Sequence, residues 1–519
     1  MRGAKRSFGL VLSAALALSV PRSGLEGAQF IRGDTDASGS VDIADPIVLL
    51  LHLYLGDGRA EGCLDAADAD DSGALDMTDA VYSLSYLFLG GPQPPAPFGK
   101  CGLDPTDDDG LDCRSAPRCE RPDVVRSDLA RDLSPELEPG DLEELVAGNT
   151  AFALDLYRRV RRGSENLFFS PLSVSVALAM AYAGAEGETE SEMRDALHFT
   201  LPEERLHRAF NYLDLELSRR GQGAAGHAGG GFQLRVVNAT WGQVDYSFLG
   251  GYLDVLAANY GSGLRLLDFL GDSEGSRGTI NEWVAAETAG RIQNLLPQGS
   301  IVPETRLVLT NAVYFSAAWA EPFAKELTRD GEFRRLDGST VVVPFMSHRW
   351  GFPYARGDGY LAVELPYDGG ELSMVLVAPD EGRFAEFEDA LSSEKLGEVV
   401  ASLRRADVQV TLPKFGCESQ FDLVEPLSDL GMPQAFQPYV ANFSGIDGTR
   451  DLYVSGVLHK SFLAVDEAGT EAAAATAVII GIVSVPEPAT FDRPFIYLIR
   501  DIPTGAVIFL GRMLDPSAR

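Results

Sequence analysis

Residues 467–488 read EAGTEAAAATAVIIGIVSVPEP, and the character of this segment changes twice along its length. It opens around Gly469, continues in very small residues, becomes β-branched and ends between two prolines. Alanine favours helix whereas Val and Ile favour strand, so the local propensities contradict each other. A buried helix that runs into an edge strand is one interpretation of this pattern.

Side-chain size suggests a second interpretation. Because side chains alternate along a strand with a period of two, one face of an extended segment would carry only small or apolar residues. That face would hold Thr470, Ala472, Ala474, Thr476, Val478 and Ile480, with Glu471 on the opposite face, where water can hold its charge. Such a segment can insert between existing strands, and it can also lie outside as a loop. The sequence is therefore consistent with two conformations.

The surrounding chain, from about residue 141 to 519, has the pattern of a large mixed α and β domain. Apolar periodicity predicts helices over 141–161, 171–183 and 280–296. Short apolar runs predict buried strands over 307–315, 372–378, 408–412 and 506–511. Helices gather early and strands late, so we expect an α+β fold with large, mostly antiparallel sheets.

This domain carries a series of short motifs in a fixed order: NLFFSPLS at 166–173, GAEGET at 184–189, NAVYF at 311–315, LPKF at 412–415, NFSG at 442–445, His459-Lys460 and DRPF at 492–495. Over residues 141–519 these ordered motifs resemble those of the serpins, a family of serine protease inhibitors. The quoted segment resembles the hinge of inhibitory members through Glu467, Gly469, Thr470, Glu471, Ala472, Ala473, Ala474, Ala475 and Thr476.

The resemblance implies an inhibitor that is consumed by its target, and not an enzyme. A protease would form an acyl-enzyme at an exposed loop, and the cleaved loop would then insert into the main sheet. The 14 residues from Thr470 to Val483 would form a strand of roughly 45–50 Å. Stored free energy would be released as that strand is added.

Two anchors place the scissile bond. Counting from the hinge and counting back from the DRPF motif both give Val483–Ser484, with Ile482 or Ser484 as bait after a slip of register. A small β-branched bait suits the shallow pocket of elastase- or subtilisin-like proteases. Trypsin-like targets are disfavoured because no Lys or Arg lies between Thr470 and Glu487.

Other matched positions are expected to control the opening of the sheet. The resemblance places Ser170, Ser173, Asn311 and His459 in a polar cluster beneath the central strands, and Trp319 where insertion begins. For His459, a satisfied core histidine is the simpler description. Neither interpretation gives it a catalytic role, and inhibition requires no cofactor.

The N-terminal part of the chain is strongly acidic. The formal charge of the whole protein is −33, and residues 29–120 carry 18 acidic against 5 basic residues. This balance disfavours nucleic acid and anionic membranes as partners.

Within this region, DTDASGSVDIAD at 34–45 and DADDSGALDMTD at 68–79 repeat one pattern 34 residues apart. Oxygen ligands fall at loop positions 1, 3, 5, 9 and 12, with glycine at position 6 and a carbonyl at position 7, which is the pattern of a calcium loop. The predicted ligands of two structural calcium ions are Asp34, Asp36, Ser38, Ser40, Asp42 and Asp45 in the first loop, and Asp68, Asp70, Ser72, Ala74, Asp76 and Asp79 in the second.

Each loop leads into a predicted helix, at 46–55 and 80–89. Over residues 31–91 the duplicated loop-helix unit resembles a dockerin, an EF-hand-like α-helical module that attaches secreted proteins to cohesin modules on scaffolds. The cysteine-rich extension is a departure from that pattern. A cohesin-like partner and a surface or self-association role therefore both stay open.

Residues 1–28 have the basic start and apolar run of a signal peptide, and no later segment is long and apolar enough to span a bilayer. We therefore expect a secreted protein, extracellular or attached to a cell surface. Cys63, Cys101, Cys113 and Cys119 would form two disulfides of undetermined pairing, with Cys417 free. The predicted order is signal peptide 1–28, module 29–119, linker 120–140 and serpin domain 141–519, with a second, Pro-rich spacer at 92–98.

Two other functions were weighed. GDSEG at 271–275 matches the G-x-S-x-G motif of hydrolases, but residues 268–279 have the pattern of a long polar loop and not of the strand that this motif requires. A serpin that no longer inhibits, and that serves as chaperone, carrier or storage protein, would be expected to lose the small residues of the hinge, which are intact here.

Overall fold

The computed structural model describes residues 30–36, 41, 43–56, 63–98, 102, 105, 111, 124–221, 233–244, 248–470 and 485–518. The expected signal peptide, and Cys101, Cys113 and Cys119, lie outside these residues. The chain divides into two compact units, Met1–Pro122 and Asp123–Arg519.

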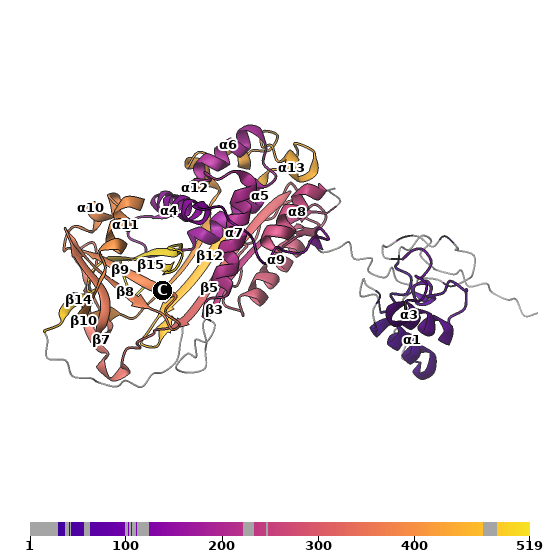
Figure 1. Ribbon diagram of the computed structural model, residues 1–519, viewed down its shortest axis with the longest axis horizontal. Coiled ribbons are helices and arrows are strands. Elements are labelled where there is room, and N and C mark those ends of the chain that lie inside the picture. The colour runs from indigo at the N-terminus through magenta and orange to yellow at the C-terminus, as the bar shows by residue number, and fades with distance from the viewer. Residues whose placement is uncertain are drawn as a thin grey trace, which may run out of the picture. The chain divides into compact units, whose positions relative to one another are not determined.

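Among its described residues, the first unit contains the helices α1 (Ala44–Leu55), α2 (Leu64–Ala67) and α3 (Met77–Leu89). α1 and α3 contact each other through a small core that includes Leu49, Ala67 and Ala80 (Figure 1). Both helices end at a glycine with positive φ, Gly56 at 63° and Gly90 at 67°. Gly56 and Gly90 are also one repeat apart, so the two helices end in the same way. The left-handed conformation at a helix end favours glycine.

Residues 92–98 are part of this unit and not a spacer. Pro97 accepts a hydrogen bond from the backbone N–H of Arg32 at 2.6 Å, and the Phe98 ring packs edge-on against Tyr86 at 5.1 Å. The prolines gave the segment the composition of a linker, but they pack against the module. Cys63 is disulfide-bonded.

The second unit contains two large sheets in the part of the chain that the structure describes. The first has seven strands in the order β1-β4-β3-β5-β13-β12-β11. Their bounds are β1 Val124–Val125, β3 Gln233–Gln243, β4 Leu264–Leu267, β5 Leu307–Ala318, β11 Phe415–Asp422, β12 Val454–Val465 and β13 Gly469–Thr470. Most pairs are antiparallel, while β3 with β4 and β5 with β12 are parallel.

The second sheet runs β14-β10-β7-β8-β9-β15-β16-β2, with β6 paired to β7 (Figure 1). Among these described strands only β10 and β14 are parallel. The bounds are β2 Leu167–Phe169, β6 Arg329–Arg334, β7 Thr340–Gly357, β8 Tyr360–Pro366, β9 Leu372–Pro379, β10 Arg404–Pro413, β14 Glu487–Thr490, β15 Phe495–Asp501 and β16 Val507–Met513. The expectation of large, mostly antiparallel sheets is confirmed.

Helices cover the sheets. They are α4 Asp141–Val160, α5 Pro171–Tyr182, α6 Gly187–Ala196, α7 Glu203–Ser218, α8 Gly250–Tyr260, α9 Ser273–Glu287, α10 Phe384–Asp389, α11 Ser393–Ser402, α12 Val424–Asp429 and α13 Ser444–Asp447. α5 is apolar almost all round and almost entirely buried, which is typical of a core helix. Ser170 caps its first turn and Pro171 occupies the first helical position.

β5 is the strand on which the first sheet is centred, and all its residues are buried. Leu309, Val313 and Phe315 join the main core, which α5 enters, while Val308 and Ala312 pack in a second cluster with residues of α9. The sheet is therefore covered on both faces at β5, by the main core on one side and by the second cluster on the other, so a new neighbour of β5 must fit between two packed layers.

The predicted helix over 280–296 is shifted in the structure, where α9 covers Ser273–Glu287. Asp272 caps its start by accepting a hydrogen bond from the N–H of Gly275 at 2.9 Å, so most of the expected polar loop at 268–279 is helical. The periodicity located the apolar face of the helix but missed this cap. Among the described residues, no helix combines the length and apolar character needed to cross a bilayer.

The described part of the expected linker, residues 124–140, is attached to the second unit. β1 pairs with β4, and Ser127 donates a hydrogen bond to Asp254 of α8 at 2.5 Å. The side chain of Asn211, fully buried in α7, donates to Asp132 O at 2.7 Å and accepts from Arg131 Nε at 2.9 Å. The segment looks like a linker in sequence because its partners lie more than 75 residues away.

We predict that Asn211→Leu lowers the free energy of unfolding by about 1–3 kcal/mol, because it removes the hydrogen bonds that the fully buried amide of Asn211 makes to Asp132 O and Arg131 Nε. Urea denaturation of the full chain measures this loss. The matched control is Asp214→Asn, which removes only the exposed ion pair with Arg131 and should cost less than about 1 kcal/mol. Equal losses for the two variants would contradict an attached segment.

Candidate functional site

The first sheet is split open at one end. β13 lies between β5 and β12: Gly469 pairs with Ala318, and Thr470 pairs with Ala317 on one side and Val465 on the other. Further along, β5 and β12 pair directly with each other, from Leu307 to Tyr314 (Figure 1). The sheet therefore has a position for one more strand, of which two residues are already in place.

Gly469 is required where the inserted strand begins. A Cβ atom at this position would lie 2.2 Å from the carbonyl oxygen of Ala317, a distance that no side chain can tolerate. Its φ of 154° is also one that L side chains rarely adopt. The absence of a side chain thus lets the chain turn from β12 into the gap beside β5.

Glu467 anchors this turn. Its carboxylate is buried, accepting hydrogen bonds from Lys414 Nζ at 2.7 Å and from Thr328 Oγ1 at 2.8 Å. Burial alone would raise the pKa of Glu467, but the hydrogen bonds from Lys414 and Thr328 lower it below its usual value. The anchor is therefore an ionised carboxylate at neutral pH.

Trp319 lies at the same end of the sheet. Its indole stacks on Tyr367 with ring centroids 4.7 Å apart, and its Nε1 donates to Asp466 O at 3.0 Å. Tyr367 in turn exchanges a hydrogen bond of 2.9 Å with the hydroxyl of Thr470. Both aromatic residues are placed to support the first residues of the insert. We did not predict Tyr367 from the sequence, because its contact with Thr470 spans 103 residues and no local pattern signals it.

The predicted polar cluster is brought together under the central strands. Asn311 of β5 accepts a hydrogen bond from His459 of β12, and its amide donates to Ser173 Oγ and to Asn238 Oδ1. Ser170, at the start of α5, donates its backbone N–H to His459 Nε2 at 3.2 Å. Asn238, on β3, is a member that the sequence had not indicated. The cluster joins three strands to one helix across the line where β5 and β12 meet.

These contacts fix the protonation state of His459. Because Nε2 accepts from Ser170, the ring proton lies on Nδ1 and points to Asn311. Complete burial lowers the pKa of His459 to about 3. A second proton would face the N–H of Ser170, so the cluster requires a neutral histidine.

The remaining predicted hinge and bait residues, namely Glu471, Ala472, Ala473, Ala474, Ala475, Thr476, Val483 and Ser484, lie outside the described residues. The chain resumes at Val485, whose side chain is 95% exposed, and enters β14 at the edge of the second sheet. The segment after the predicted bond is therefore accessible from solvent.

The serine of the hydrolase-like motif has a structural role. Ser273 begins α9, and its hydroxyl donates to Phe269 O at 2.6 Å. It follows a short turn capped by Asp272 and not an abruptly ending strand, so the arrangement that a nucleophilic serine needs is missing at this place.

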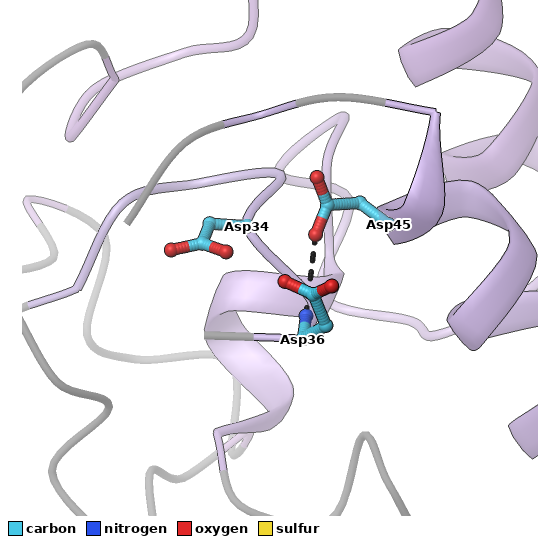
Figure 2. A group of neighbouring side chains, drawn as sticks. All are labelled: Asp34, Asp36 and Asp45. Atoms are coloured by element: carbon cyan, nitrogen blue, oxygen red, sulfur yellow. Dashed lines mark hydrogen bonds between the residues drawn. The ribbon is translucent and has the colours of Figure 1, made fainter. Parts of the chain in front are cut away.

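In the first unit, the two repeated loops each gather three carboxylates. Ligand atoms of Asp34, Asp36 and Asp45 lie within 4.8 Å of one another, as do those of Asp68, Asp70 and Asp79. Figure 2 shows the first group, in which the N–H of Asp36 donates to Asp45 Oδ1 at 3.2 Å. The equivalent bond in the second loop runs from Asp70 N to Asp79 Oδ1 at 3.3 Å. The repeat in sequence is thus a repeat in geometry.

The other predicted ligands are placed differently. Asp76 caps α3 by accepting from the N–H of Thr78 at 2.6 Å, and Ser72 Oγ donates to Ala74 O at 3.3 Å. Gly73, at loop position 6, has a φ of 76°, as the sharp turn requires. Ser38, Ser40 and Asp42 lie outside the described residues.

The carboxylate groups fit a hard divalent cation. Asp70 Oδ1 is buried without a hydrogen-bond partner, although buried polar atoms normally have one. Burial, together with a smaller effect of the adjacent Asp68, raises the pKa of Asp79 to about 7. Three carboxylates with an unused oxygen match the oxygen ligands that calcium prefers.

Comparison with known proteins agrees with this architecture of helices and two large sheets. The sequence pattern of the family Serpin (serine protease inhibitor) matches residues 147–516. Leukocyte elastase inhibitor A of Mus musculus is 40% identical over 392 residues, which cover 72% of this chain and all of that protein. An uncharacterized serpin-like protein of Thermococcus kodakarensis is 39% identical, covering 73% and 88%.

Among solved structures, the thermophilic serpin tengpin in its native state matches with a TM-score of 0.66 and 28% identity, covering 75% of this chain and 97% of tengpin. The chain belongs to the serpin family.

We predict that acid destabilises this protein partly through His459. An unfolded histidine binds a proton below about pH 6.5, whereas buried His459 stays neutral down to about 3, so the stability held at neutral pH is lost as the pH falls between these values. The expected slope from this group is about 1.4 kcal/mol per pH unit. Glu467, whose pKa is lowered in the native state, acts in the same direction.

The variant His459→Gln separates the contribution of His459 to the acid response from that of the other groups. Glutamine can donate and accept a hydrogen bond at this place but does not titrate. Urea midpoints of both proteins at pH 7.5, 6.0 and 5.0 should converge as the pH falls. Parallel curves would show that His459 contributes nothing to the acid response.

Proposed function

We propose that this protein is a secreted inhibitor that traps elastase- or subtilisin-like serine endopeptidases by cleavage and insertion of its own loop, and that its N-terminal module holds it in place through calcium. The observation that carries the inhibitory part is β13, the beginning of the loop already seated between β5 and β12. The protease serine would attack the carbonyl of Val483, the amine of Ser484 would leave, and insertion would follow before water hydrolyses the acyl bond.

The registers of β5 and β12 give the position of every inserted residue. Continuing the pairing of Thr470 with Ala317 places Thr476 opposite Asn311. Continuing the pairing of Thr470 with Val465 places Thr476 opposite His459. Both registers give the same position for Thr476, since Asn311 and His459 are paired with each other. Thr476 would therefore come between the two residues whose hydrogen bond closes the sheet.

The same register explains the small side chains. Residues opposite each other in an antiparallel pair point to the same face, so Ala472, Ala474 and Thr476 would enter the main core beside Phe315 and Val313. This core is already filled, so only small residues fit there. Glu471 would fall opposite Ser316, on the other face. The intact pattern favours an inhibitor over a serpin that only stores or carries.

The bait residue supports the class of target. Val483 is small and β-branched, which suits a shallow pocket better than the acidic pocket that binds Lys or Arg. The similarity to leukocyte elastase inhibitor A, which is named for an elastase, supports the same class.

Secretion is supported by two features. Residues 1–28 have the pattern of a signal peptide, and the Cys63 disulfide requires an oxidising compartment.

The tethering role of the module is supported by its exposed apolar residues. They occur in pairs exactly one repeat apart: Ile43 with Met77, Ile47 with Val81, Tyr54 with Phe88 and Leu55 with Leu89. Soluble proteins seldom expose so many large apolar side chains on two neighbouring helices. We call these eight residues the paired apolar surface, and we assign it to a cohesin-like or cell-surface partner.

We predict a denaturation-resistant adduct when the purified protein is incubated with pancreatic-type elastase or with a subtilisin, and none with trypsin. Gel electrophoresis detects the adduct, and mass spectrometry should find a released peptide that begins at Ser484. Cleavage in the loop without an adduct would mean a substrate-like or non-inhibitory serpin displayed by its module.

Two variants of one residue test the insertion register. Thr476→Arg would drive a charge between Asn311 and His459, so it should turn the inhibitor into a substrate. The matched control Thr476→Val keeps the shape and should still form the adduct. Adduct formation by Thr476→Arg at the level of the natural protein would exclude this register.

We predict that the full chain binds two calcium ions, measured by isothermal titration calorimetry, and that Asp34→Ala and Asp68→Ala each abolish one of them, because each removes a ligand buried in its loop. Protease inhibition should be unchanged in both, since the reactive loop belongs to the other unit. The double variant Leu55→Asp, Leu89→Asp should keep both calcium ions and lose binding to a recombinant cohesin module or to cell envelopes. Calcium-independent heat stability of the module would contradict a structural metal.

A further inference from the structure

Arg32 is a fully buried arginine in a small acidic module. It stands beside the first repeat in sequence, but its side chain contacts the second. It precedes the first calcium loop by two residues, yet its side chain reaches the second loop. A buried guanidinium must be paired and hydrogen-bonded to be tolerated. Its partners therefore indicate what it holds in place.

The guanidinium contacts the second loop through a hydrogen bond and an ion pair. Nη1 donates to the carbonyl oxygen of Asp68 at 3.1 Å, and Nη2 forms an ion pair of 2.9 Å with the carboxylate of Asp71. Nε donates to Ala96 O at 3.3 Å, and the Phe30 ring lies 5.4 Å away. Asp68 supplies the first ligand of the loop, and Asp71 lies between the ligands at positions 3 and 5.

Asp71 is in a conformation that needs support. Its φ is 61°, in the left-handed region, which aspartate adopts more readily than most residues but less readily than glycine. This conformation turns the chain between Asp70 and Ser72, two of the predicted ligands. The ion pair with Arg32 ties the Asp71 side chain to the buried guanidinium and so supports this conformation.

The sequence does not repeat this pair at the equivalent positions of the first loop. One repeat after Arg32 the chain has Ala66, and one repeat before Asp71 it has Ala37. The Arg32–Asp71 pair therefore has no counterpart at these two positions, whereas the carboxylates at loop positions 1, 3 and 12 are duplicated.

We propose that Arg32 is a positioning residue that preorganises the second calcium loop, so that this loop is the tighter of the two sites. The inference rests on the proposed calcium binding. Asp71 neutralises the charge of Arg32, so the brace orders the loop without opposing the cation. Outer partners of metal ligands typically change metal affinity by about 10–100-fold.

The test is a titration of the full chain with calcium chloride by isothermal calorimetry, with a chelator as competitor. Two single variants assign each measured affinity to a loop. Asp70→Ala should abolish calcium binding at the tighter site, and Asp36→Ala should abolish it at the weaker site. Arg32→Met should weaken the tighter site by about tenfold or more, and the weaker by less than about threefold. Arg32→Lys, which keeps the charge but loses the fork, should have nearly the same effect.

Asp71→Asn is the second variant, because it removes the ion pair while asparagine tolerates the same φ and Arg32 stays in place. It should weaken the tighter site in the same direction. Unchanged or tighter binding in Arg32→Met and Asp71→Asn would overturn the inference, and so would equal weakening of both sites, which indicates only a general loss of stability. A natural protein that binds no calcium would refute the proposed calcium function. A natural protein that binds two calcium ions, with affinities that the Arg32 and Asp71 variants leave unchanged, would refute only the inference, so the two failures are distinguishable.

Discussion

The structure depends on one contact between two parallel strands, β5 and β12. These strands pair directly along most of their shared length and are separated at one end by two residues of β13. His459 and Asn311 join them beneath the sheet, and Ser170 fixes the histidine as a neutral donor. A strand inserted here, as we propose, would replace this contact with two ladders of hydrogen bonds, so the sheet would gain backbone pairing.

The features around this contact are those that we propose to control where opening begins. Gly469 permits the turn, Glu467 holds it through Lys414 and Thr328, and Thr470 is held by Tyr367. Each group lies at the split end, so in the proposed insertion the strands would separate first there and then toward the polar cluster. The core beside Phe315 and Val313 is already filled, which is the physical reason why the inserted strand would need small residues.

The N-terminal unit uses a different principle, in which carboxylates are brought together against their repulsion. Burial raises the pKa values of Asp68 and Asp79, and the neighbouring carboxylates contribute in the same direction. A bound cation would relieve this cost, and the proposed role of Arg32 is to order one loop in advance. Proposed capture of a protease and proposed attachment therefore rest on separate energy sources: a strand added to a sheet, and metal ions bound to loops.

The sequence by itself determined the family, the duplicated carboxylate loops and most helices and buried strands, because these follow from local spacing and side-chain size. It also placed Ser170, Ser173, Asn311 and His459 in one cluster through the family resemblance. Only the tertiary structure decided the contacts between distant residues: Tyr367 on Thr470, Asn238 in the cluster, Arg32 on Asp71, and the attachment of residues 124–134 to α7 and α8. Such pairs leave no periodic trace, since each partner is chosen by the fold and not by its neighbours in the chain.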